Sequence, residues 1–334
     1  MDATPVILEL TNLHCYDEGD SIGSAEPYLW TVFFKIDGDS VHIDNTLTLR
    51  GTATVVATVG NHGDIGPGGV GAGDDIPIPA SLGRFETTVK PIPLDVPIGS
   101  LVDFPGTVGC IIVLLEQDST SDDAVAAGRA ALTSAVQDAL DTMIPTLNVL
   151  HTAPTQEELD AMTAQIGKAV EDAISDQVSI WDWLGALGNM DDKIGSAVLR
   201  YSQADLDAAA YSGIPISQEW ENEGDWLITG SASAVIDELT IGCIHKPSGN
   251  VEAHHIERVG GVYNGSNWRM TRDQVIQFLQ QGKRFGVAGA DGSHSDVEVF
   301  KHWVSNANPT GLYIATTRDG SKADNLLSLP DCGD

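Results

Sequence analysis

The stretch that decides the fold runs from Leu8 to Trp30 and reads LELTNLHCYDEGDSIGSAEPYLW. An alternation of apolar and polar residues, typical of a half-buried strand, ends at Cys15, and a new strand opens at Tyr28. The loop between the strands contains glycine, serine and the carboxylates Asp17, Glu18, Asp20 and Glu26. The stretch therefore predicts an acidic loop between two strands of a β-sandwich.

A second acidic segment follows a strand much later in the chain. The predicted strand Cys110–Leu115 is followed by Glu116, Asp118, Asp122 and Asp123. Calcium takes about six to eight hard oxygen ligands, which short loops can supply. We expect a calcium site on the rim of the sandwich, with Asp17, Asp20, Asp118 and Asp123 as the main ligands and Glu18, Glu26 and Asp122 as further ones. The alternative is a solvated cluster, since Asp, Ser and Gly are ordinary turn residues.

The charge of the chain limits its partners. The sequence has 17 Lys and Arg against 48 Asp and Glu, which gives a net charge of −31. Such a field repels nucleic acid and anionic lipid and attracts cations. The acids are spread along the whole chain, so most of the charge indicates general solubility rather than many metal sites. The length of 334 residues and the hydrophobic fraction of 42% favour two or more domains with real cores.

The N-terminus, MDATPVILEL, has neither a basic segment nor a long apolar segment, so no signal peptide is expected. No apolar run is long enough to cross a bilayer. These features predict a soluble protein that is cytoplasmic or exported by a non-classical route.

The four cysteines are far apart, and none lies in a CxxC motif, so a structural zinc site is not expected. Cys15 and Cys110 both end or begin strands beside the acidic loops, so a position near each other, as in a disulfide, is one interpretation. We expect small core thiols instead. The sequence leaves the disulfide state of Cys15, Cys110, Cys243 and Cys332 open.

The domain organisation predicted from the patterns is α+β and multidomain. Residues 123–143 carry an apolar stripe of helical period, and Thr155 with Glu158 forms a capping box that begins a second helix. Each stripe needs a partner, so the helices are expected to form an antiparallel hairpin. A shorter helix is predicted over 203–211, and strand character returns over 226–239. Residues 1–121 and 222–242 are therefore assigned to the sandwich, and residues 122–221 to a helical insertion.

The C-terminal residues 250–334 form a separate small α+β module in this interpretation. A strand is expected over 251–259 and a helix after the capping box at Thr271 and Gln274, with Gly282 as its C-terminal stop. Further strands are expected over 285–288, 297–303 and 312–317.

Two resemblances agree with these boundaries. Residues 6–123, through DEGD (17–20), AEPYLW (25–30) and the later acidic loop, resemble a bacterial C2-like sandwich, which implies calcium binding by loops at one end. Ala25 departs from the pattern, because a further acid often stands there. Residues 250–334 resemble a bacterial family of uncharacterised function, whose signature is carried here by Trp268, Gly282, Lys283, Thr317, Asp319, Gly320, Asp324, Asn325, Leu326, Leu327, Leu329, Pro330 and Cys332.

The function predicted from these features is non-enzymatic, because no nucleophile, base and oxyanion donor occur together. We expect a calcium-dependent binding protein that engages a membrane surface, a glycan or a protein, with no nucleic-acid partner. The alternatives are a pore-forming, toxin-like protein that uses the helical hairpin, and a self-assembling structural subunit that forms homo-oligomers.

Overall fold

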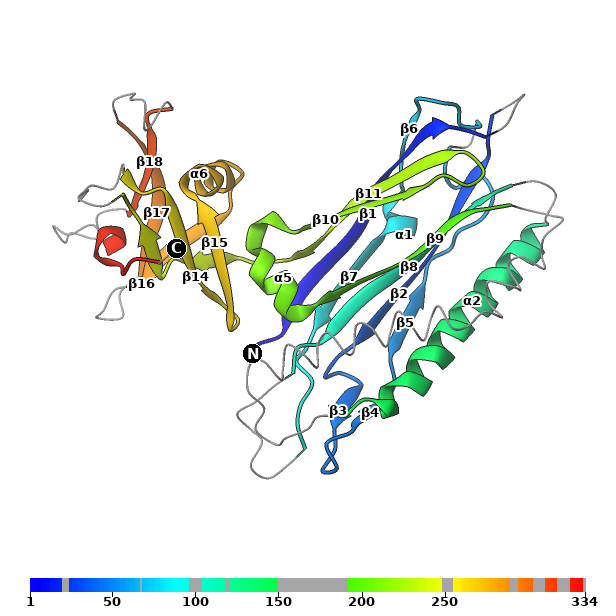
Figure 1. The fold of residues 1–334 in the computed structure, drawn as a ribbon, viewed down its shortest axis with the longest axis horizontal. Coiled ribbons are helices and arrows are strands. Elements are labelled where there is room, and N and C mark those ends of the chain that lie inside the picture. Colours follow the sequence, from blue (N-terminus) through cyan, green and yellow to red (C-terminus); the bar gives the residue numbers. More distant parts are fainter. Residues whose placement is uncertain are drawn as a thin grey trace. The chain divides into compact units, whose positions relative to one another are not determined.

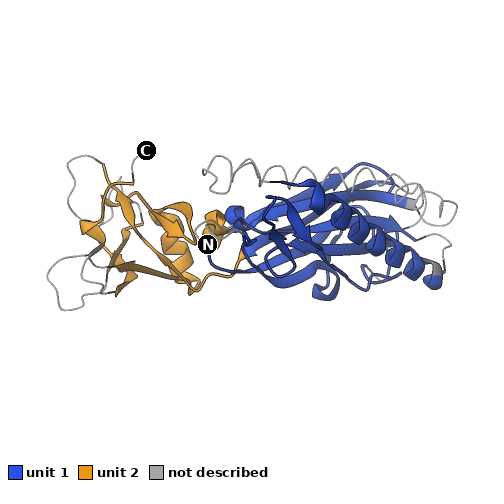
Figure 2. Ribbon diagram, turned by 90° about the horizontal axis from the view of Figure 1, so that it is seen from below, with its two compact units in different colours: residues 1–206, 214–233 blue, residues 207–213, 234–334 orange. Residues whose placement is uncertain are grey.

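The computed structural model describes residues 1–19, 24–66, 68–95, 104–117, 121–148, 192–247, 255–288, 294–302, 310–316 and 325–332. The chain forms two compact units (Figure 2). Unit 1 comprises Met1–Leu206 and Ile214–Ser233, and unit 2 comprises Asp207–Gly213 and Ala234–Asp334. Both consist mainly of strands with a few helices, which confirms a mixed α+β protein.

Unit 1 contains a five-stranded sheet with the order β10-β11-β1-β6, in which β7 also pairs with β1. Its strands are β1 (Thr4–Asp17), β6 (Asp75–Pro77), β7 (Arg84–Val89), β10 (Ile214–Trp220) and β11 (Asp225–Ala234). The inward face of β1 begins with Val6, Leu8 and Leu10, which are buried at every second position. This alternation is the strand pattern that the sequence predicts.

The second sheet of unit 1 has four strands in the order β5-β2-β8-β9. Its strands are β2 (Pro27–Ile36), β5 (Thr54–Ala57), β8 (Thr107–Glu116) and β9 (Asp192–Ser202), and a small sheet of β3 (Val41–Ile43) and β4 (Leu49–Gly51) lies apart from it. Every residue of β2 is buried, so both faces of this sheet are covered. A largely apolar run such as that of β2 (PYLWTVFFKI) is expected for a strand that is buried on both sides.

One face of the second sheet packs on the first sheet. Phe33 of β2 stacks on Phe85 of β7 with 5.1 Å between ring centroids. The hydroxyl of Thr31 donates a hydrogen bond to the carbonyl of Leu82, in the short helix α1 (Ala80–Gly83) between the sheets. Unit 1 is therefore built on two facing sheets (Figure 1).

The other face of the second sheet is covered by the helix α2 (Asp122–Met143), which continues into η1 (Ile144–Thr146) (Figure 1). The predicted apolar stripe of this helix is buried, at Val125, Leu132, Val136, Leu140 and Met143. These side chains join one cluster with Trp30 and Phe34 of β2. The predicted second helix, from Thr155 to Trp181, lies outside the described residues.

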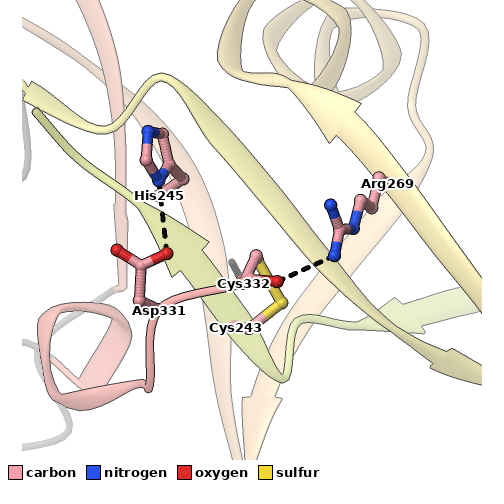
Figure 3. Close-up of a disulfide and its surroundings, with 5 residues drawn as sticks. All are labelled: Cys243, His245, Arg269, Asp331 and Cys332. Carbon is pink, nitrogen blue, oxygen red and sulfur yellow. Dashed lines mark hydrogen bonds and ion pairs between the residues drawn. A yellow bond between two sulfur atoms is a disulfide. The ribbon is translucent and has the colours of Figure 1, made fainter. Parts of the chain in front are cut away.

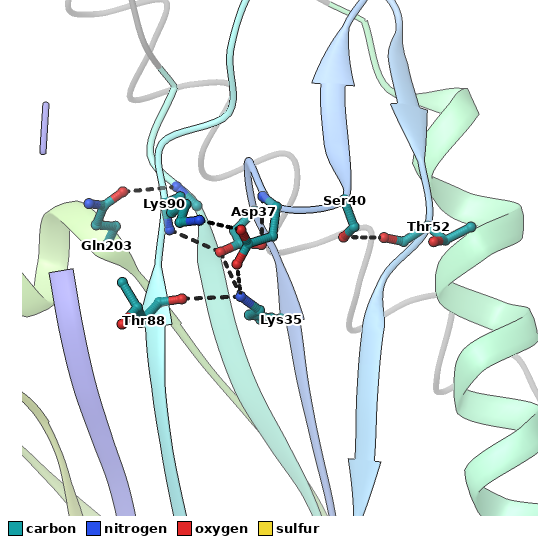
Figure 4. A network of polar contacts seen from close by, with 9 residues as sticks. Lys35, Asp37, Ser40, Thr52, Thr88, Lys90 and Gln203 are labelled. Atoms are coloured by element: carbon teal, nitrogen blue, oxygen red, sulfur yellow. Dashed lines mark hydrogen bonds and ion pairs between the residues drawn. The ribbon is translucent and has the colours of Figure 1, made fainter. Parts of the chain in front are cut away.

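Charged side chains are buried where β2 ends (Figure 4). Lys35 Nζ lies 3.0 Å from Asp37 Oδ2 and donates to the carbonyl of Thr88 in β7 at 3.1 Å. Burial lowers the pKa of Lys35, but the hydrogen bonds and charges of Asp39 and Asp37 outweigh it, so the pKa is raised. The network ties the two sheets together at this end, so its role is structural.

Strands occur inside the segment 122–221, which the sequence predicts to be a helical insertion. β9 pairs with β8 along its length, and β10 pairs with β11. The described part of this segment is therefore helical only in α2, η1, α5 (Gln203–Ala209) and η2 (Ala210–Ser212). The last two cover the helix predicted over 203–211 and extend one residue beyond it. The physical reason is that β8 is buried and needs a hydrogen-bonding neighbour on each side.

In its described residues, unit 2 contains two sheets and the helix α6, together with the end of α5 and two short 3-10 helices, η2 and η4. One sheet has the order β12-β16-β17-β18 and the other β13-β14-β15. The elements are β12 (Glu238–Thr240), β13 (Cys243–His245), β14 (Arg258–Tyr263), β15 (Ser266–Thr271), α6 (Arg272–Gln280), β16 (Arg284–Ala288), β17 (His294–Lys301), β18 (Leu312–Thr316) and η4 (Asn325–Ser328). The capping box of Thr271 and Gln274 is confirmed at the start of α6, and Gly282 follows it with φ +84°.

The boundary of unit 2 differs from the prediction. The predicted strand over 226–239 is two strands, because β11 ends at Ala234 and β12 begins at Glu238. β12 pairs in parallel with β16, so the residues from Ala234 onward belong with the C-terminal unit and not with the sandwich. This pairing joins strands that are distant in sequence, and local periodicity does not encode it.

Candidate functional site

The two acidic segments lie at the same end of unit 1. β2 and β8 are antiparallel, with Pro27 opposite Glu116, so the start of β2 adjoins the end of β8. Gln117 donates its backbone N–H to the carbonyl of Glu26 at 3.0 Å. We call this end, with the described residues 17–19, 24–26, 61–75 except 67, 116–117, 121–123 and 221–225, the acidic rim.

The glycine-rich loop over 61–75 contacts both sides of the acidic rim. Near its start, His62 Nδ1 lies 3.1 Å from Asp122 Oδ1. Further along, Ala25 and Val70 exchange backbone hydrogen bonds of 2.9 and 2.7 Å. Near its end, Cys15 donates its backbone N–H to the carbonyl of Asp74 at 3.0 Å. The loop therefore links the segment after β1 to the segment after β8.

Two of the predicted ligands in the first segment, Asp17 and Glu18, accept hydrogen bonds from backbone groups. Asp17 Oδ1 accepts the N–H of Gly19 at 2.9 Å, and Glu18 Oε2 accepts the N–H of Ala72 at 2.9 Å. Asp17 and Glu26 are exposed, and Glu18 is half-buried. The carboxylates of Asp17 and Glu18 are thus oriented by backbone N–H groups.

The predicted ligands of the second segment begin the helix α2. Asp122 and Asp123 lie in its first turn, where negative charge also stabilises a helix, and both are exposed. Asp20 and Asp118, which the sequence also predicts as ligands, lie outside the described residues.

Two carboxylates that sequence reasoning missed belong to the acidic rim. Asp74 lies at the end of the glycine-rich loop, and Asp225 begins β11 after the hairpin turn at Gly224. Gly224 approaches the carbonyl of Asp17 so closely that a Cβ there would lie 2.3 Å from it. Oδ1 of Asp225 is buried and, within the described part of the chain, has no hydrogen-bond partner. Asp225 follows the acidic turn ENEG (221–224), and this turn is the sequence feature that could have identified it as a candidate ligand.

The charge of the acidic rim acts on Cys15. The pKa of the Cys15 thiol is raised to about 11. Burial is the largest cause, and the negative charges of Glu18, Asp17, Asp74 and Asp225 add to it. These four carboxylates come from the end of β1, the glycine-rich loop and the start of β11. The negative potential therefore converges on one place from three parts of the chain, and a cation placed there would relieve it.

A pocket of about 360 Å³ opens beside Glu26 in the acidic rim. Its walls are Glu26, Pro27, Gln117, Ile65 and the glycines Gly63, Gly66, Gly68 and Gly69. Glycines leave backbone carbonyls accessible, and carbonyl oxygens are ligands that calcium accepts.

The spacing of the acidic rim differs from that of a closed metal cage. Within the described ranges, three ligand atoms come within 4.8 Å of one another only in Glu238, His294 and Asp296 of unit 2. The five described carboxylates among the predicted ligands therefore converge on one end of unit 1 without forming a compact group.

Unit 2 contains a disulfide between Cys243 and Cys332 (Figure 3). Beside it, His245 Nδ1 lies 3.2 Å from Asp331 Oδ1, and Arg269 donates to the carbonyl of Cys332 at 2.8 Å. Cys15 and Cys110 are free and buried, which confirms the expectation of core thiols. The disulfide settles the state that the sequence leaves open for the other two cysteines.

The fold defines a mostly β, two-unit α+β protein with a strongly acidic end. Residues 240–330, within unit 2, match a family model described as "Protein of unknown function (DUF3892)". The match agrees with the expectation of an uncharacterised C-terminal domain. No curated protein and no solved structure shows significant similarity to the chain. In the part of the chain that the structure describes, no helix is both long and apolar enough to cross a bilayer.

Proposed function

We propose that the chain is a calcium-dependent binding protein in which the acidic rim of unit 1 coordinates Ca²⁺ and thereby engages a partner. The observation that carries the proposal is Oδ1 of Asp225, a buried carboxylate oxygen without a hydrogen-bond partner among the described residues. Its charge acts on the Cys15 thiol together with those of Asp17, Glu18 and Asp74. An unpaired buried carboxylate is costly, and a bound cation offsets that cost. The resemblance of residues 6–123 to a C2-like sandwich supports this proposal, because it implies calcium binding by loops at one end.

The choice of calcium rests on the chemistry of the ligands. Carboxylates and the carbonyls of glycine-rich loops are hard oxygen donors, and calcium tolerates variable geometry and incomplete cages that water completes. A calcium ion at the acidic rim also bridges to a phosphate or carboxylate of the partner. The partner is therefore a membrane surface, a glycan or a protein that presents anionic oxygen atoms.

The described helix of the predicted hairpin favours a binding protein over a pore-forming one. Besides its buried stripe, α2 is held by polar bonds to the strand region beside it. Asp141 Oδ1 accepts the N–H of Ala53 at 2.8 Å, and Gln137 Nε2 donates to the carbonyl of Ala53 at 2.9 Å. Detaching α2 would expose these groups and the apolar stripe together, so we assign it a structural role.

The test is calorimetric titration of the full chain with CaCl₂, with thermal melting in calcium and in EDTA. We expect saturable heat and a higher melting temperature in calcium, while MgCl₂ at the same ionic strength gives a smaller shift. If CaCl₂ gives no binding heat, or if CaCl₂ and MgCl₂ give the same heat, the proposed calcium site is wrong. Sedimentation with phosphatidylserine vesicles then examines a membrane partner.

Two further measurements separate the alternatives. Calcium-independent dye release from vesicles would favour the pore-forming function. Light scattering that shows a large assembly without calcium would favour the structural subunit.

A further inference from the structure

A second group of possible metal ligands lies on the β12-β16-β17 face of unit 2. Glu238 belongs to β12, and His294 and Asp296 belong to β17, with β16 between these strands. In the register, Gly286 of β16 pairs with Asp296. The three side chains therefore come from two strands that are not neighbours and meet over the strand between them.

Gly286 permits this meeting. A Cβ at this position would lie 2.2 Å from His294 Nε2 and 2.5 Å from Glu238 Oε1. Any other residue would fill the space that the imidazole and the carboxylate occupy. The absence of a side chain at Gly286 thus leaves a small cradle above β16, which His294 Nε2 and Glu238 Oε1 occupy.

The ligand atoms of Glu238, His294 and Asp296 all lie within 4.8 Å of one another. His294 Nε2 and Glu238 Oε1 are at hydrogen-bond distance, and His294 Nδ1 lies 3.9 Å from Asp296 Oδ1. One imidazole nitrogen and two carboxylate oxygens suit zinc and similar transition metals, whereas calcium sites are built from oxygen.

Arg284 holds the outer side of the group. Its guanidinium lies 2.8 Å from Oε2 of Glu238 and 3.6 Å from Oδ1 of Asp296. Glu238 thus offers Oε1 to the cradle and uses Oε2 for the arginine. An outer partner that fixes the orientation of a ligating carboxylate is a regular feature of metal sites. Arg284 is therefore a positioning residue, and the cradle keeps its open side towards solvent.

We propose that unit 2 binds a divalent transition metal of the zinc type through Glu238, His294 and Asp296, with water as the remaining ligand. A metal ligated by the imidazole needs a ring nitrogen that carries no proton, so a proton on that nitrogen is released to solvent on binding. The site is independent of the acidic rim in residues and in ligand chemistry.

The test uses the full chain without reducing agent, so that Cys243 and Cys332 stay bonded and supply no thiolate. Zn²⁺ is titrated by calorimetry, and Co²⁺ is followed by visible absorption, which reports the coordination geometry. We expect one saturable site. His294→Gln should weaken binding at least about tenfold, since a ligand is lost, whereas His302→Gln, an exposed histidine of the same unit, should leave it unchanged.

A second variant addresses the cradle without removing a ligand. Gly286→Ala should weaken Zn²⁺ binding to a similar extent, with hydrogen exchange of β14 and β15 unchanged to show that unit 2 still folds. Equal affinities for the parent, His294→Gln and His302→Gln proteins would overturn the proposal and leave the group as an ion-pair cluster. Asp225→Asn should not change the affinity for Zn²⁺, so this outcome stands apart from that at the acidic rim.

Discussion

The backbone N–H of Gln117 donates to the carbonyl of Glu26 at 3.0 Å, and this bond joins the segment after β8 to the loop that opens β2. The bond lies at the wall of the pocket in the acidic rim, between carboxylates that are distant in sequence. Calcium binding to one segment is therefore expected to order the other. The first prediction concerns the carboxylate on which that proposal depends.

Asp225→Asn should have opposite effects without and with calcium. Without calcium, the substitution removes the charge of a half-buried carboxylate whose Oδ1 has no hydrogen-bond partner among the described residues, so the free energy of unfolding should rise by about 1 kcal/mol. With calcium, the variant should lose most of the calcium-induced gain in the free energy of unfolding. Urea unfolding in EDTA and in CaCl₂ measures both effects.

The matched control is Asp95→Asn, which makes the same charge change at an exposed residue beside His42, 3.7 Å away. Its response to calcium should equal that of the parent protein. If both variants lose the calcium response alike, net charge and not a site at the acidic rim is responsible.

The stability of unit 1 should fall in alkaline solution because of Cys15. The folded pKa of this thiol is about 11, raised from 9.0 first by burial and then by the rim carboxylates. The stabilisation is therefore complete below pH 9 and is lost as the pH rises from 9 towards 11, since only the unfolded chain releases the proton there. The loss should approach about 2–3 kcal/mol at pH 11.

The measurement is the urea midpoint of the parent and of Cys15→Ala between pH 8 and 11. At pH 8 the urea midpoint of Cys15→Ala should be lower than that of the parent, because the substitution creates a cavity. As the pH rises, the midpoint of the variant should decline less steeply. Parallel declines would mean that Cys15 titrates normally in the folded protein. Other groups with raised pKa values, such as Tyr201, affect both proteins equally and cancel in the comparison.

Much of the fold is predictable because its signals are local. The alternation in β1 and the stripe of α2 report which faces are buried, and both are confirmed. The capping box of α6 is confirmed because Thr271 and Gln274 satisfy each other within one turn. Such features need no knowledge of the rest of the chain.

The errors arise where distant strands pair. β9 contains several half-buried residues and no clean alternation, and its place beside β8 follows from the needs of β8. Asp225 reaches the acidic rim only because β11 is the neighbour of β1 in the sheet. The sequence therefore indicated an acidic end but not the carboxylate that turns inward, and it missed the group around Gly286 for the same reason.

Removing Asp37 should destabilise unit 1 far more than removing its neighbour Asp39. Asp37 is fully buried, and Oδ2 accepts from Lys35 Nζ at 3.0 Å and from the N–H of Lys90 at 2.9 Å. Asp37→Ala leaves the buried ammonium of Lys35 with one carboxylate fewer, and we expect a loss of about 3–5 kcal/mol. Asp39→Ala, at a more exposed carboxylate, should cost about 1 kcal/mol or less.

Chemical denaturation of the two variants gives the comparison. Equal losses would show that the exposed part of the network matters as much as the buried pair. Calcium affinity should be unchanged in Asp39→Ala, since the network lies at the opposite end of β2 from the acidic rim.

Reduction of the disulfide should destabilise unit 2 and leave unit 1 unchanged. Cys243 and Cys332 are separated by 89 residues, and a cross-link over such a loop restricts the unfolded chain by up to roughly 4–5 kcal/mol. After reduction, the C-terminal end is held to β13 by the backbone bonds of Ile244 with Pro330 and Cys332, of 3.0 and 3.1 Å. Dithiothreitol should therefore increase hydrogen exchange first in β13 and next in β14.

Peptides of β2 and β8 should keep their protection, because the cysteines of unit 1 are already free. The double variant Cys243→Ser/Cys332→Ser should exchange like the reduced protein and show no response to dithiothreitol, and a response in that variant would assign the effect to another cause.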